Sequence, residues 1–394
     1  MECRKEGEGV KKSGNLGGTH LHLYYCAWTN ESRAWREGAS ALRHGLAKQV
    51  IYVGYRSGEL PEAQTRGEGQ LIRRIGAAPV APGSSRWLRA ASLPRWWRAC
   101  LRDIDLTNVD LIVAHSLAAL PVALALKWRA GVGLVYDAHE LETERAGWSW
   151  GIRRIARFFE ERLIRGCDHT FVVSDAIKDW YLGAYPGLAV TTVRNIADTK
   201  AASEASSLRQ TLKIATETLV YTYCGAITRE RGLEELVDVF RDIGNEYALV
   251  LVGDGPALEE LRIRASGTEN IYFHSAVPVD HLVNLISGAD VGIFVTASAS
   301  LSYRYCLPNK VFEYAAAKLP MLLGDGPELL RFAQEYPAVR TVASNRAALH
   351  KAIATWTCSE IRAARSAIQY IPPTWREEEH LLVNVFKDVQ SQYA

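Results

Sequence analysis

The 394-residue sequence has no long apolar run, no closely paired cysteines and almost no net charge. No stretch approaches the ~18 consecutive apolar residues of a membrane-spanning helix, and residues 1–18 carry charges and glycines where a signal peptide needs an apolar core. The seven cysteines include no CxxC pair, which disfavours a zinc knuckle and a disulfide framework and predicts a reduced, cytoplasmic setting. A formal net charge of +2 disfavours a protein that binds nucleic acid through a strongly basic surface.

Two nucleotide-binding motifs are also missing, and each absence disfavours a class of enzyme. No GxGxxG follows any predicted strand, which argues against a dehydrogenase, and no Walker motif is present, which argues against an NTPase. No cluster of histidine, cysteine or carboxylate residues has the spacing of metal ligands. We therefore expect neither a bound metal nor a cofactor.

Short β-branched or aromatic runs alternate with longer segments of helical period along most of the chain. This alternation is typical of βα units on a parallel sheet, and the length exceeds what one hydrophobic core usually supports. We therefore predict an α/β protein with two Rossmann-like, doubly wound domains that face a cleft. The expected divisions are a loose tail at 1–18, a first domain at 19–198, a polar linker at 199–213, a second domain at 214–372 and a C-terminal helix at 373–394. We expect this helix to pack back, with the N-terminal domain as the leading candidate.

Histidines stand at the ends of two predicted strands of the first domain. The strand DLIVAHS carries His115 near its end, and the strand GLVYDAH ends at His139. Because the carboxyl ends of parallel strands meet at one edge of a sheet, both imidazoles are candidates for the cleft. There they could hydrogen-bond sugar hydroxyls or act as an acid or base near neutral pH. An equally good alternative is that each histidine caps a helix or satisfies a buried carbonyl.

The second domain begins with YCGAITRERGLEEL, which reads as a strand, then Gly225, then Arg231 ahead of a helix. Backbone amides at a helix N-terminus together with a cation favour a phosphate, although arginines before a helix are more often solvated surface. A second tight turn, Gly253-Asp254-Gly255, follows the strand LVLV at the same predicted edge.

The segment SYRYCLPNKVFEYAAAKLP, residues 302–320, places Lys310 and Glu313 inside a largely apolar helix. Pro308 suits the first turn of a helix, and free amides near Asn309 would face an anion beside the lysine charge. A carboxylate one turn further on can accept hydrogen bonds from both hydroxyls of a ribose. An intrahelical Lys–Glu pair would contribute only about 0.2–0.5 kcal/mol, too little to explain two charges in an apolar setting. The segment therefore predicts a nucleotide grip, with phosphate first and ribose second.

Together these motifs resemble the GT-B fold glycosyltransferases, and among them glycosyltransferase family 4. The resemblance rests on YDAHELE, CGAITRERGLEELV, LVLVGDGP and LPNKVFEYAAAKLP, which follow one another in this order within residues 20–390. It implies that the second domain binds a nucleotide sugar, that Glu313 holds the ribose and that Arg231 binds the diphosphate. It also implies a histidine near the transferred sugar, for which His139 is the first choice and His115 the second. The other expected donor contacts are Gly225, Gly253, Asp254, Ser275, Val277, Tyr305, Pro308, Asn309 and Lys310.

Three positions depart from the family pattern. Tyr305 stands eight residues before Glu313, where many members carry a glutamate that contacts the donor sugar. Ala226 follows the first glycine of the second domain, where a basic residue is common, and Lys318 replaces a glycine. The base is expected to contact backbone near Ser275 to Val277, which leaves its identity open, as the missing glutamate leaves the sugar open.

The resemblance implies transfer of a sugar from a UDP- or GDP-linked donor to a glycan or lipid-linked acceptor in cell-surface polysaccharide biosynthesis, with retention and without a metal. Three alternatives stay open at this point. They are a nucleotide-sugar epimerase or hydrolase on the same fold, a catalytically inactive relative that only binds, and a protein that binds nucleic acid or another anionic polymer.

The first domain is expected to choose the acceptor. Asn30, Arg33 and Arg36 in and after its first loop are candidates for a phosphorylated or acidic acceptor. Residues 86–102 contain five arginines, three tryptophans and no acidic residue, and residues 148–166 repeat the theme. This mixture suits the inner face of an anionic membrane and a polyprenyl- or other lipid-linked acceptor. The alternative is that the tryptophans are core and the arginines cover them with their stems.

Overall fold

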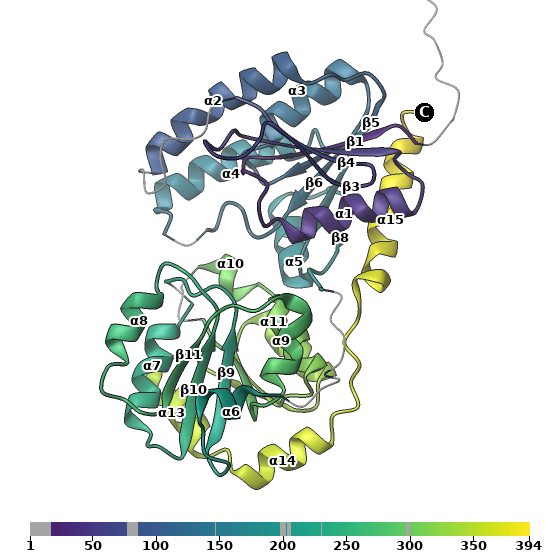
Figure 1. Cartoon of the computed structure of the whole chain (residues 1–394). Coiled ribbons are helices and arrows are strands. Elements are labelled where there is room, and N and C mark those ends of the chain that lie inside the picture. The colour runs from purple at the N-terminus through teal and green to yellow at the C-terminus, as the bar shows by residue number, and fades with distance from the viewer. Residues whose placement is uncertain are drawn as a thin grey trace, which may run out of the picture.

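The structure is a computed structural model that describes residues 17–76, 86–145, 147–197, 202, 206–229, 231–296 and 300–394, without the side chains of 86–91 and 279. Two α/β domains, each built on its own sheet, lie one above the other in Figure 1. Every strand pair except one is parallel, which confirms the predicted fold class. No helix in the described part of the chain is long and apolar enough to cross a bilayer.

The N-terminal domain has an eight-stranded sheet in the order β3-β4-β2-β1-β5-β6-β7-β8. The central strands are apolar and buried on both faces, as a sheet with helices on either side requires. Its strands are β1 (Thr19–Tyr24), β2 (Gln49–Gly54), β3 (Ala63–Gly67), β4 (Gln70–Arg74), β5 (Val109–His115), β6 (Gly133–Ala138), β7 (His169–Val172) and β8 (Val190–Thr192). Its helices are α1 (Ser32–Arg43), α2 (Arg86–Asp103), α3 (Leu120–Ala130), α4 (Trp150–Ile164) and α5 (Asp175–Ala184).

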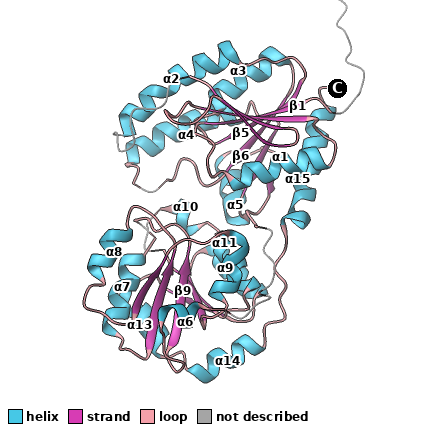
Figure 2. Ribbon diagram, viewed as in Figure 1, coloured by secondary structure: helices cyan, strands magenta, loops and turns pink. Residues whose placement is uncertain are grey.

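The C-terminal domain has a six-stranded parallel sheet in the order β11-β10-β9-β12-β13-β14. Helices lie on both sides of this sheet in Figure 2, and one cluster of buried residues forms its core. Its strands are β9 (Leu219–Cys224), β10 (Tyr247–Val252), β11 (Ile271–His274), β12 (Val291–Phe294), β13 (Met321–Gly324) and β14 (Val339–Val342). The helices are α6 (Leu208–Leu212), α7 (Leu233–Asp242), α8 (Leu258–Arg264), α9 (Val279–Ile286), α10 (Leu301–Arg304), α11 (Asn309–Ala316), α12 (Pro327–Glu335), α13 (Arg346–Ala354), α14 (Cys358–Ser366) and α15 (Trp375–Ser391).

The last helix, α15, leaves the C-terminal domain and packs against the first one (Figure 1). It begins at a capping box, in which Thr374 and Glu377 satisfy each other's backbone amides. Its apolar face joins α1 and the buried face of β5 and β6 in one core cluster. The opposite face of the same sheet is covered by α2, α3 and α5.

Two regions differ from the sequence-based expectation. The hairpin of β3 and β4 was not predicted, because β3 is an exposed edge strand whose polar residues give no apolar alternation. The second half of the predicted linker forms α6, and its Leu208 is fully buried in the C-terminal core. Residues 1–16 of the predicted tail, and residues 199–201 and 203–205 of the linker, lie outside the described residues.

Direct contacts join the two domains beside the cleft. The Ser174 hydroxyl donates to the Tyr305 carbonyl at 2.7 Å, and the Ser300 hydroxyl donates to the Glu144 carbonyl at 2.7 Å. Glu328 of α12 accepts a hydrogen bond at 2.9 Å from the Ala176 amide, at the N-terminus of α5. The carboxylate of one domain therefore caps a helix of the other, which fixes how the two sheets face each other.

Replacing Phe386 tests whether α15 holds the first domain together. Its ring is fully buried, 5.3 Å from the His20 ring and 5.8 Å from the Phe171 ring. We expect Phe386→Ala to lower the free energy of unfolding by about 3–5 kcal/mol, because it leaves a cavity between helix and sheet. Urea unfolding measures this, with Leu381→Ala on the exposed side of the same helix as control. Equal losses in the two variants would show that α15 only rests on the domain.

Candidate active site

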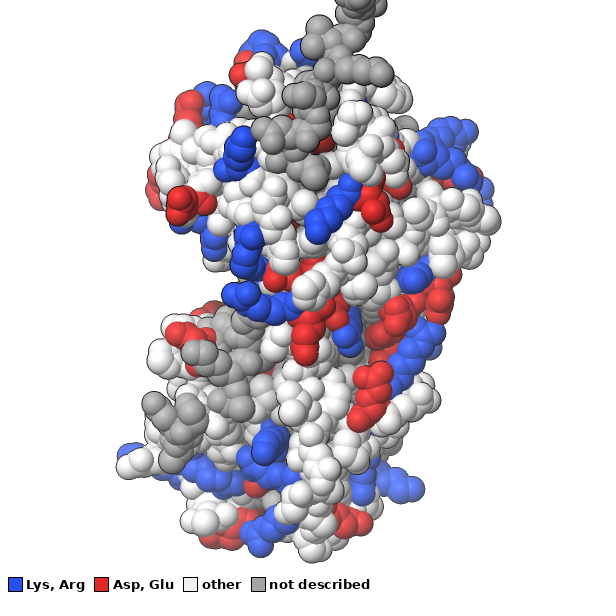
Figure 3. All heavy atoms as spheres, turned by 90° about the vertical axis from the view of Figure 1, so that its right-hand side faces the viewer, with Lys and Arg blue, Asp and Glu red and all other residues white. Residues whose placement is uncertain are grey.

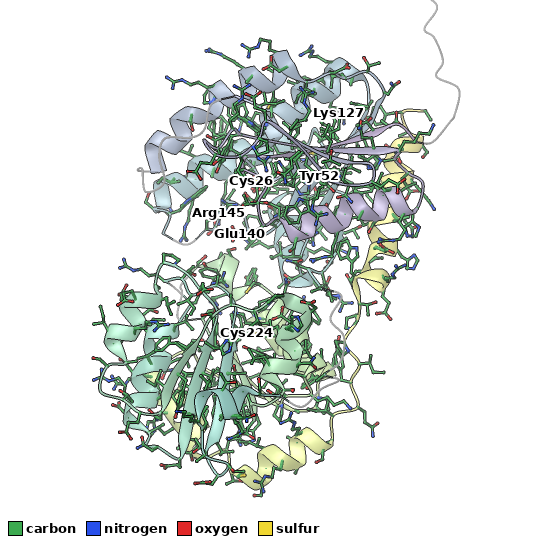
Figure 4. The ribbon with its side chains drawn as sticks, in the orientation of Figure 1. Cys26, Tyr52, Lys127, Glu140, Arg145 and Cys224 are labelled. Atoms are coloured by element: carbon green, nitrogen blue, oxygen red, sulfur yellow. The ribbon has the colours of Figure 1, made fainter. Side chains whose placement is uncertain are left out.

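Two groups of polar side chains lie at the carboxyl ends of the two sheets. We call Cys224, Gly225, Arg231, Lys310 and Glu313 the donor half-site, and His22, Arg33, Glu37, His115, Asp137 and His139 the histidine cluster. In Figure 4, Glu140 and Arg145, which follow β6, lie at the edge of the upper domain that faces the lower one, where Cys224 ends β9. Figure 3 shows side chains of both charges gathered where the two lobes meet.

Lys310 is a buried lysine that forms no salt bridge with a carboxylate of the described residues. It lies in the first turn of α11, is 7% exposed, and its Nζ sits 3.7 Å from the centre of the Tyr223 ring and 4.9 Å from that of Phe294. Burial lowers its pKa from 10.5 to about 7. Within the described residues it forms no ion pair or hydrogen bond, so the ordinary explanation, a Lys310–Glu313 pair, does not hold.

Glu313 lies one turn along the same helix and is 9% exposed. Its one hydrogen bond in the described structure comes from the Cys224 thiol, at 3.3 Å from Sγ to Oε2. Burial raises the pKa of this carboxyl. A carboxylate with a single weak thiol donor keeps most of its accepting capacity for a ligand.

The glycine turns bring the loops after β9 and β10 into contact. Gly225 has φ +121°, and a Cβ there would come within 3.4 Å of Lys310 Nζ, so the glycine lies directly beside the ammonium group. Gly253 has φ +146°, and a Cβ there would meet the Gly225 carbonyl at 2.0 Å. Asp254 accepts a hydrogen bond from the Ala276 amide at 3.1 Å, which ties this turn to the segment after β11.

The remaining predicted donor residues lie around this core. Arg231 stacks over the Tyr303 ring at 4.7 Å, and its buried Nε has no partner among the described residues. Pro308 is the N-cap of α11, one position earlier than predicted, and Asn309 is its first residue. In the segment after β11, Ser275 is exposed and its carbonyl accepts from His274 Nδ1, while Val277 packs against the C-terminal core.

Tyr305 lies between the domains. It follows α10, its carbonyl accepts from Ser174, and its side chain packs against the core of the N-terminal domain. Ser302 of α10 donates to Glu140 at 3.1 Å. The position at which relatives carry a sugar-binding glutamate therefore serves a domain contact in this structure.

The histidine cluster centres on Asp137, which is fully buried. Asp137 Oδ2 lies 3.1 Å from His115 Nδ1 and 2.8 Å from His139 Nε2. Arg33 donates to the same carboxylate from Nε at 3.0 Å and from its second nitrogen at 2.8 Å. Against the opposing effect of burial, the Arg33 charge and the histidine contacts hold the pKa of Asp137 well below its usual range.

Burial disfavours a charge on the inner members of the cluster. His22 Nδ1 lies 2.9 Å from His115 Nε2, and burial lowers the pKa of His115 to about 4 and that of His22 well below its usual value. Burial, together with the charge of Asp137, raises the pKa of Glu37 well above its usual value. Arg33 thus lies between two buried carboxylates, Asp137 at 2.8 Å and Glu37 at 3.1 Å, and its charge compensates for their burial.

Two sets of atoms in this cluster are close enough to hold a metal ion. They are His22, Glu37 and His115, and His115, Asp137 and His139. The residues fit a metal poorly, because Asp137 Oδ2 already has three donor nitrogens around it and Arg33 brings a positive charge to both carboxylates. The geometry is better explained as a hydrogen-bonded network.

The structure contradicts the acceptor-side expectation for Arg33. Arg33 is 4% exposed and is bound to Asp137 and to the Val193 carbonyl, so it does not face the cleft. Arg36 bonds to Asn195 and lies over the Trp375 ring of α15. Asn30 is exposed, and its backbone N–H donates to the Glu31 carboxylate. The sequence around Arg33 does not indicate that Arg33 pairs with Asp137, which lies 104 positions away.

The predicted membrane segment at 86–102 is also corrected. In α2, Trp96 is 1% exposed in the core, and Trp97 packs beside it and donates to the Ala118 carbonyl at 2.9 Å. Arg95 and Arg98 are exposed beside them, as expected if the tryptophans belong to the core and the arginine stems cover them. Trp87 lies outside the described side chains. The second segment, in α4, behaves differently: Trp150 is 74% exposed, and Ile155, Phe158 and Phe159 are also exposed.

Sequence reasoning missed Asp137, although it stands in the quoted strand GLVYDAH. An acidic residue inside an otherwise apolar strand was the available signal, because such a charge needs a buried partner. It also missed the aromatic surroundings of Lys310, whose rings come from strands 87 and 16 residues away in sequence.

Comparisons with known proteins agree with this arrangement. The profile of Glycosyltransferase Family 4 matches residues 39–201, and that of Glycosyl transferases group 1 matches residues 218–356. A relative from Bacillus subtilis (strain 168), described as uncharacterized glycosyltransferase YqgM, is 27% identical over 192 residues, which cover 47% of this chain. The match spans about half of that protein, 52% of its length.

Solved structures with the same fold cover nearly the whole chain. Sucrose-phosphate synthase from Thermosynechococcus elongatus has a TM-score of 0.75 at 15% identity, over 95% of this chain and 100% of its own. Anabaena HepE, in complex with UDP and glucose, has a TM-score of 0.65 at 14% identity, over 95% and 99%. WaaG, a glycosyltransferase involved in lipopolysaccharide biosynthesis, has a TM-score of 0.64 at 15% identity, over 94% and 99%.

Two sheets that face each other across polar strand ends, together with these structures, show that the chain has the GT-B fold. The family 4 profile matches the N-terminal domain and the group 1 profile matches the C-terminal domain, so the two matches together support a glycosyltransferase of the family 4 type. The chain is therefore a transferase of the EC 2.4 class.

Replacing Lys310 tests how its charge is accommodated. Between pH 7 and 10.5 the unfolded chain holds a proton at this lysine that the folded ligand-free protein has lost, so this group makes stability rise with pH in that window. We expect Lys310→Met to be more stable than the wild type at pH 7, with a gap that narrows towards pH 9. Urea unfolding at several pH values measures it, with the exposed Lys318→Met as control. A gap independent of pH would contradict this account.

Proposed function

We propose that this protein transfers a sugar from a UDP- or GDP-linked donor to a glycan or lipid-linked acceptor in cell-surface polysaccharide biosynthesis. The observation that carries the proposal is the pair Lys310 and Glu313, two buried charged groups one turn apart that lack an ion-pair partner within the described residues. A diphosphate beside the lysine and a ribose beside the glutamate would supply the missing partners.

Known structures of the fold favour UDP as the first donor to test. HepE has been solved in complex with UDP and with UDP-glucose, and a trehalose-6-phosphate protein of E. coli has been solved with UDP-2-fluoro glucose. The segment after β11 offers backbone groups at Ser275 to Val277 for the base, which would leave UDP and GDP to be distinguished by shape.

We propose that the donor binds without a metal. A metal at a diphosphate neutralises charge on the leaving group. Here the ammonium of Lys310, the unpartnered Nε of Arg231 and the first amides of α11 could do the same.

Retention is part of the proposal. The carboxylates that follow β6 are committed to arginines, since Glu140 and Glu142 pair with Arg145, and Glu144 pairs with Arg153 and Arg157. A double displacement needs a free carboxylate nucleophile near the sugar. The arrangement therefore favours attack on the face from which the diphosphate leaves, with His139 beside the sugar.

Nucleotide binding tests the donor site. We expect UDP to raise the melting temperature of the wild type, and Glu313→Ala to weaken UDP binding about 10-fold or more, because a charge-assisted hydrogen bond contributes about 1.5–3 kcal/mol. Thermal shift titration with UDP, GDP and their sugars measures this. Glu217→Ala, an exposed glutamate before the amino end of β9, is the matched control. The donor-site proposal fails if no nucleotide stabilises the wild type.

We further propose that α4 binds an anionic membrane surface, which would bring a lipid-linked acceptor to the cleft. One side of α4 exposes Trp150, Ile155, Phe158 and Phe159, and arginines stack on two of these rings. The helix carries four arginines and two glutamates, one of which is buried. Exposed aromatic rings among arginines match the headgroup region of an anionic bilayer.

Vesicle co-sedimentation tests this surface. We expect binding to vesicles that contain anionic lipid at low salt, and its loss in the variant Trp150→Ser/Phe158→Ser/Phe159→Ser, because these rings supply the buried apolar area. Ile263→Ser removes an equally exposed apolar residue from the C-terminal domain and is expected to change nothing. Binding that survives the triple replacement would rule out α4 as the membrane surface.

A further inference from the structure

We infer that the buried Arg33–Asp137 ion pair positions His139 by fixing which of its two ring nitrogens carries the proton. The inference rests on the proposed function, in which His139 touches the sugar or the acceptor. Arg33 and Asp137 are 4% and 0% exposed, so neither can touch a substrate itself. They are positioning residues, and they act through the histidine.

The charge state of Asp137 is the first step. Arg33 Nε lies 3.0 Å from Oδ2, and its second guanidinium nitrogen lies 2.8 Å from Oδ1, so the carboxylate is held on both oxygens. Arginine does not lose its proton in proteins, and an ionised carboxylate next to it can only accept hydrogen bonds. Nitrogens that face Asp137 must therefore carry protons.

His139 presents Nε2 to this carboxylate. The distance from His139 Nε2 to Asp137 Oδ2 is 2.8 Å. We infer from the charge of Asp137 that Nε2 carries the proton and donates, so that a ring with one proton leaves Nδ1 without one. Nδ1 has no hydrogen-bond partner in the described part of the chain. The side chain is 21% exposed and directly follows β6 at the carboxyl edge of the sheet. The ring therefore offers a proton acceptor where a sugar hydroxyl would arrive.

The same carboxylate sets the inner rings. His115 Nδ1 also donates to Oδ2, at 3.1 Å, which leaves His115 Nε2 to accept from His22 Nδ1 at 2.9 Å. His115 Nδ1 and His139 Nε2 are also 3.0 Å apart, within hydrogen-bond distance of each other. In our inference both nitrogens carry protons, and both protons point to the ionised Asp137 oxygen. With Asp137 ionised, one set of tautomers for His22, His115 and His139 is consistent with all of these contacts.

An amide in place of the carboxylate would reverse this polarity. The amide side chain introduced by Asp137→Asn can turn its NH₂ towards the rings, so His139 Nε2 would accept and Nδ1 would carry the proton. His139 Nδ1, which accepts a hydroxyl proton in our inference, would then be a hydrogen-bond donor. In a serine protease, the corresponding aspartate-to-asparagine change preserves the geometry and still lowers kcat by about 10⁴-fold through the wrong tautomer.

The test reads the tautomer directly. We label the full chain with ¹⁵N-histidine, assign the His139 resonances with His139→Gln, and compare the wild type with Asp137→Asn at pH 8. We expect a proton on Nε2 in the wild type and on Nδ1 in the variant. With UDP-glucose or the active donor, we expect kcat to fall at least about 100-fold, the lower end for lost acid–base catalysis, while the donor KM changes less than about 3-fold.

Controls separate this inference from folding and from the donor site. Asp168→Asn alters another paired aspartate of the same domain, 2.8 Å from Lys127, and is expected to leave the His139 tautomer and kcat unchanged. Arg33→Met/Asp137→Asn removes both buried charges together, so it avoids a lone arginine if the single variant does not fold, and it is expected to show the same tautomer change. If the wild type does not bind UDP, the proposed function is wrong, but the tautomer measured at His139 is unaffected.

Three outcomes overturn the inference. They are a wild-type His139 protonated on Nδ1, a tautomer that does not change in either variant, and a stoichiometric divalent metal in the purified protein that depends on His115 and His139. A metal would occupy the nitrogen that the inference assigns to a proton.

Discussion

Burying a charged group costs free energy unless a partner or several hydrogen bonds compensate for it, and this constraint organises both domains. Asp137 meets it with Arg33 and two imidazoles. Glu160 of α4 meets it with the hydroxyls of Tyr136, Tyr181 and Tyr185 at 2.9–3.0 Å, although burial still raises its pKa to about 7. Both groups are satisfied inside one domain, so each explains local order without any ligand.

The donor half-site breaks this rule. Lys310 rests on aromatic rings, and Glu313 accepts one thiol hydrogen bond. Burial removes water from the Lys310 ammonium group, and an aromatic ring stabilises a cation less than a carboxylate does. The pKa of Lys310 therefore falls to about 7. Groups left in this state in a folded protein are typical of a site that is completed by its ligand. Within the described residues, the contrast between the paired Asp137 and the unpaired Lys310 and Glu313 is what points to a ligand at the donor half-site.

The sequence predicts the order of strands and helices, but it does not predict which buried side chains pair with each other. Parallel strands buried on both faces leave a strong apolar signal, so the twelve strands that carry the two sheets beyond the β3–β4 hairpin followed from the alternation. Lys310 and Glu313 were found because two charges in an apolar helix lack a local explanation. Arg33 was assigned to the acceptor because a loop arginine and a buried arginine look alike until the chain brings Asp137 against it. Trp96 likewise faces the core because of helix rotation, which the mixed arginine and tryptophan pattern of α2 does not fix.

One loop connects the features that matter for transfer. Residues 139–149 follow β6 and lead into α4. The loop begins with His139, continues with Glu140, which accepts from Ser302 of α10, and reaches Glu144, whose carboxylate binds Arg153 and Arg157 of α4. Contacts to α4, contacts to the C-terminal domain and the histidine therefore lie on one short stretch of backbone. At the start of this stretch, the buried carboxylate of Asp137 lies 2.8 Å from His139 Nε2, so the histidine is anchored to the sheet as well as placed beside the domain contact.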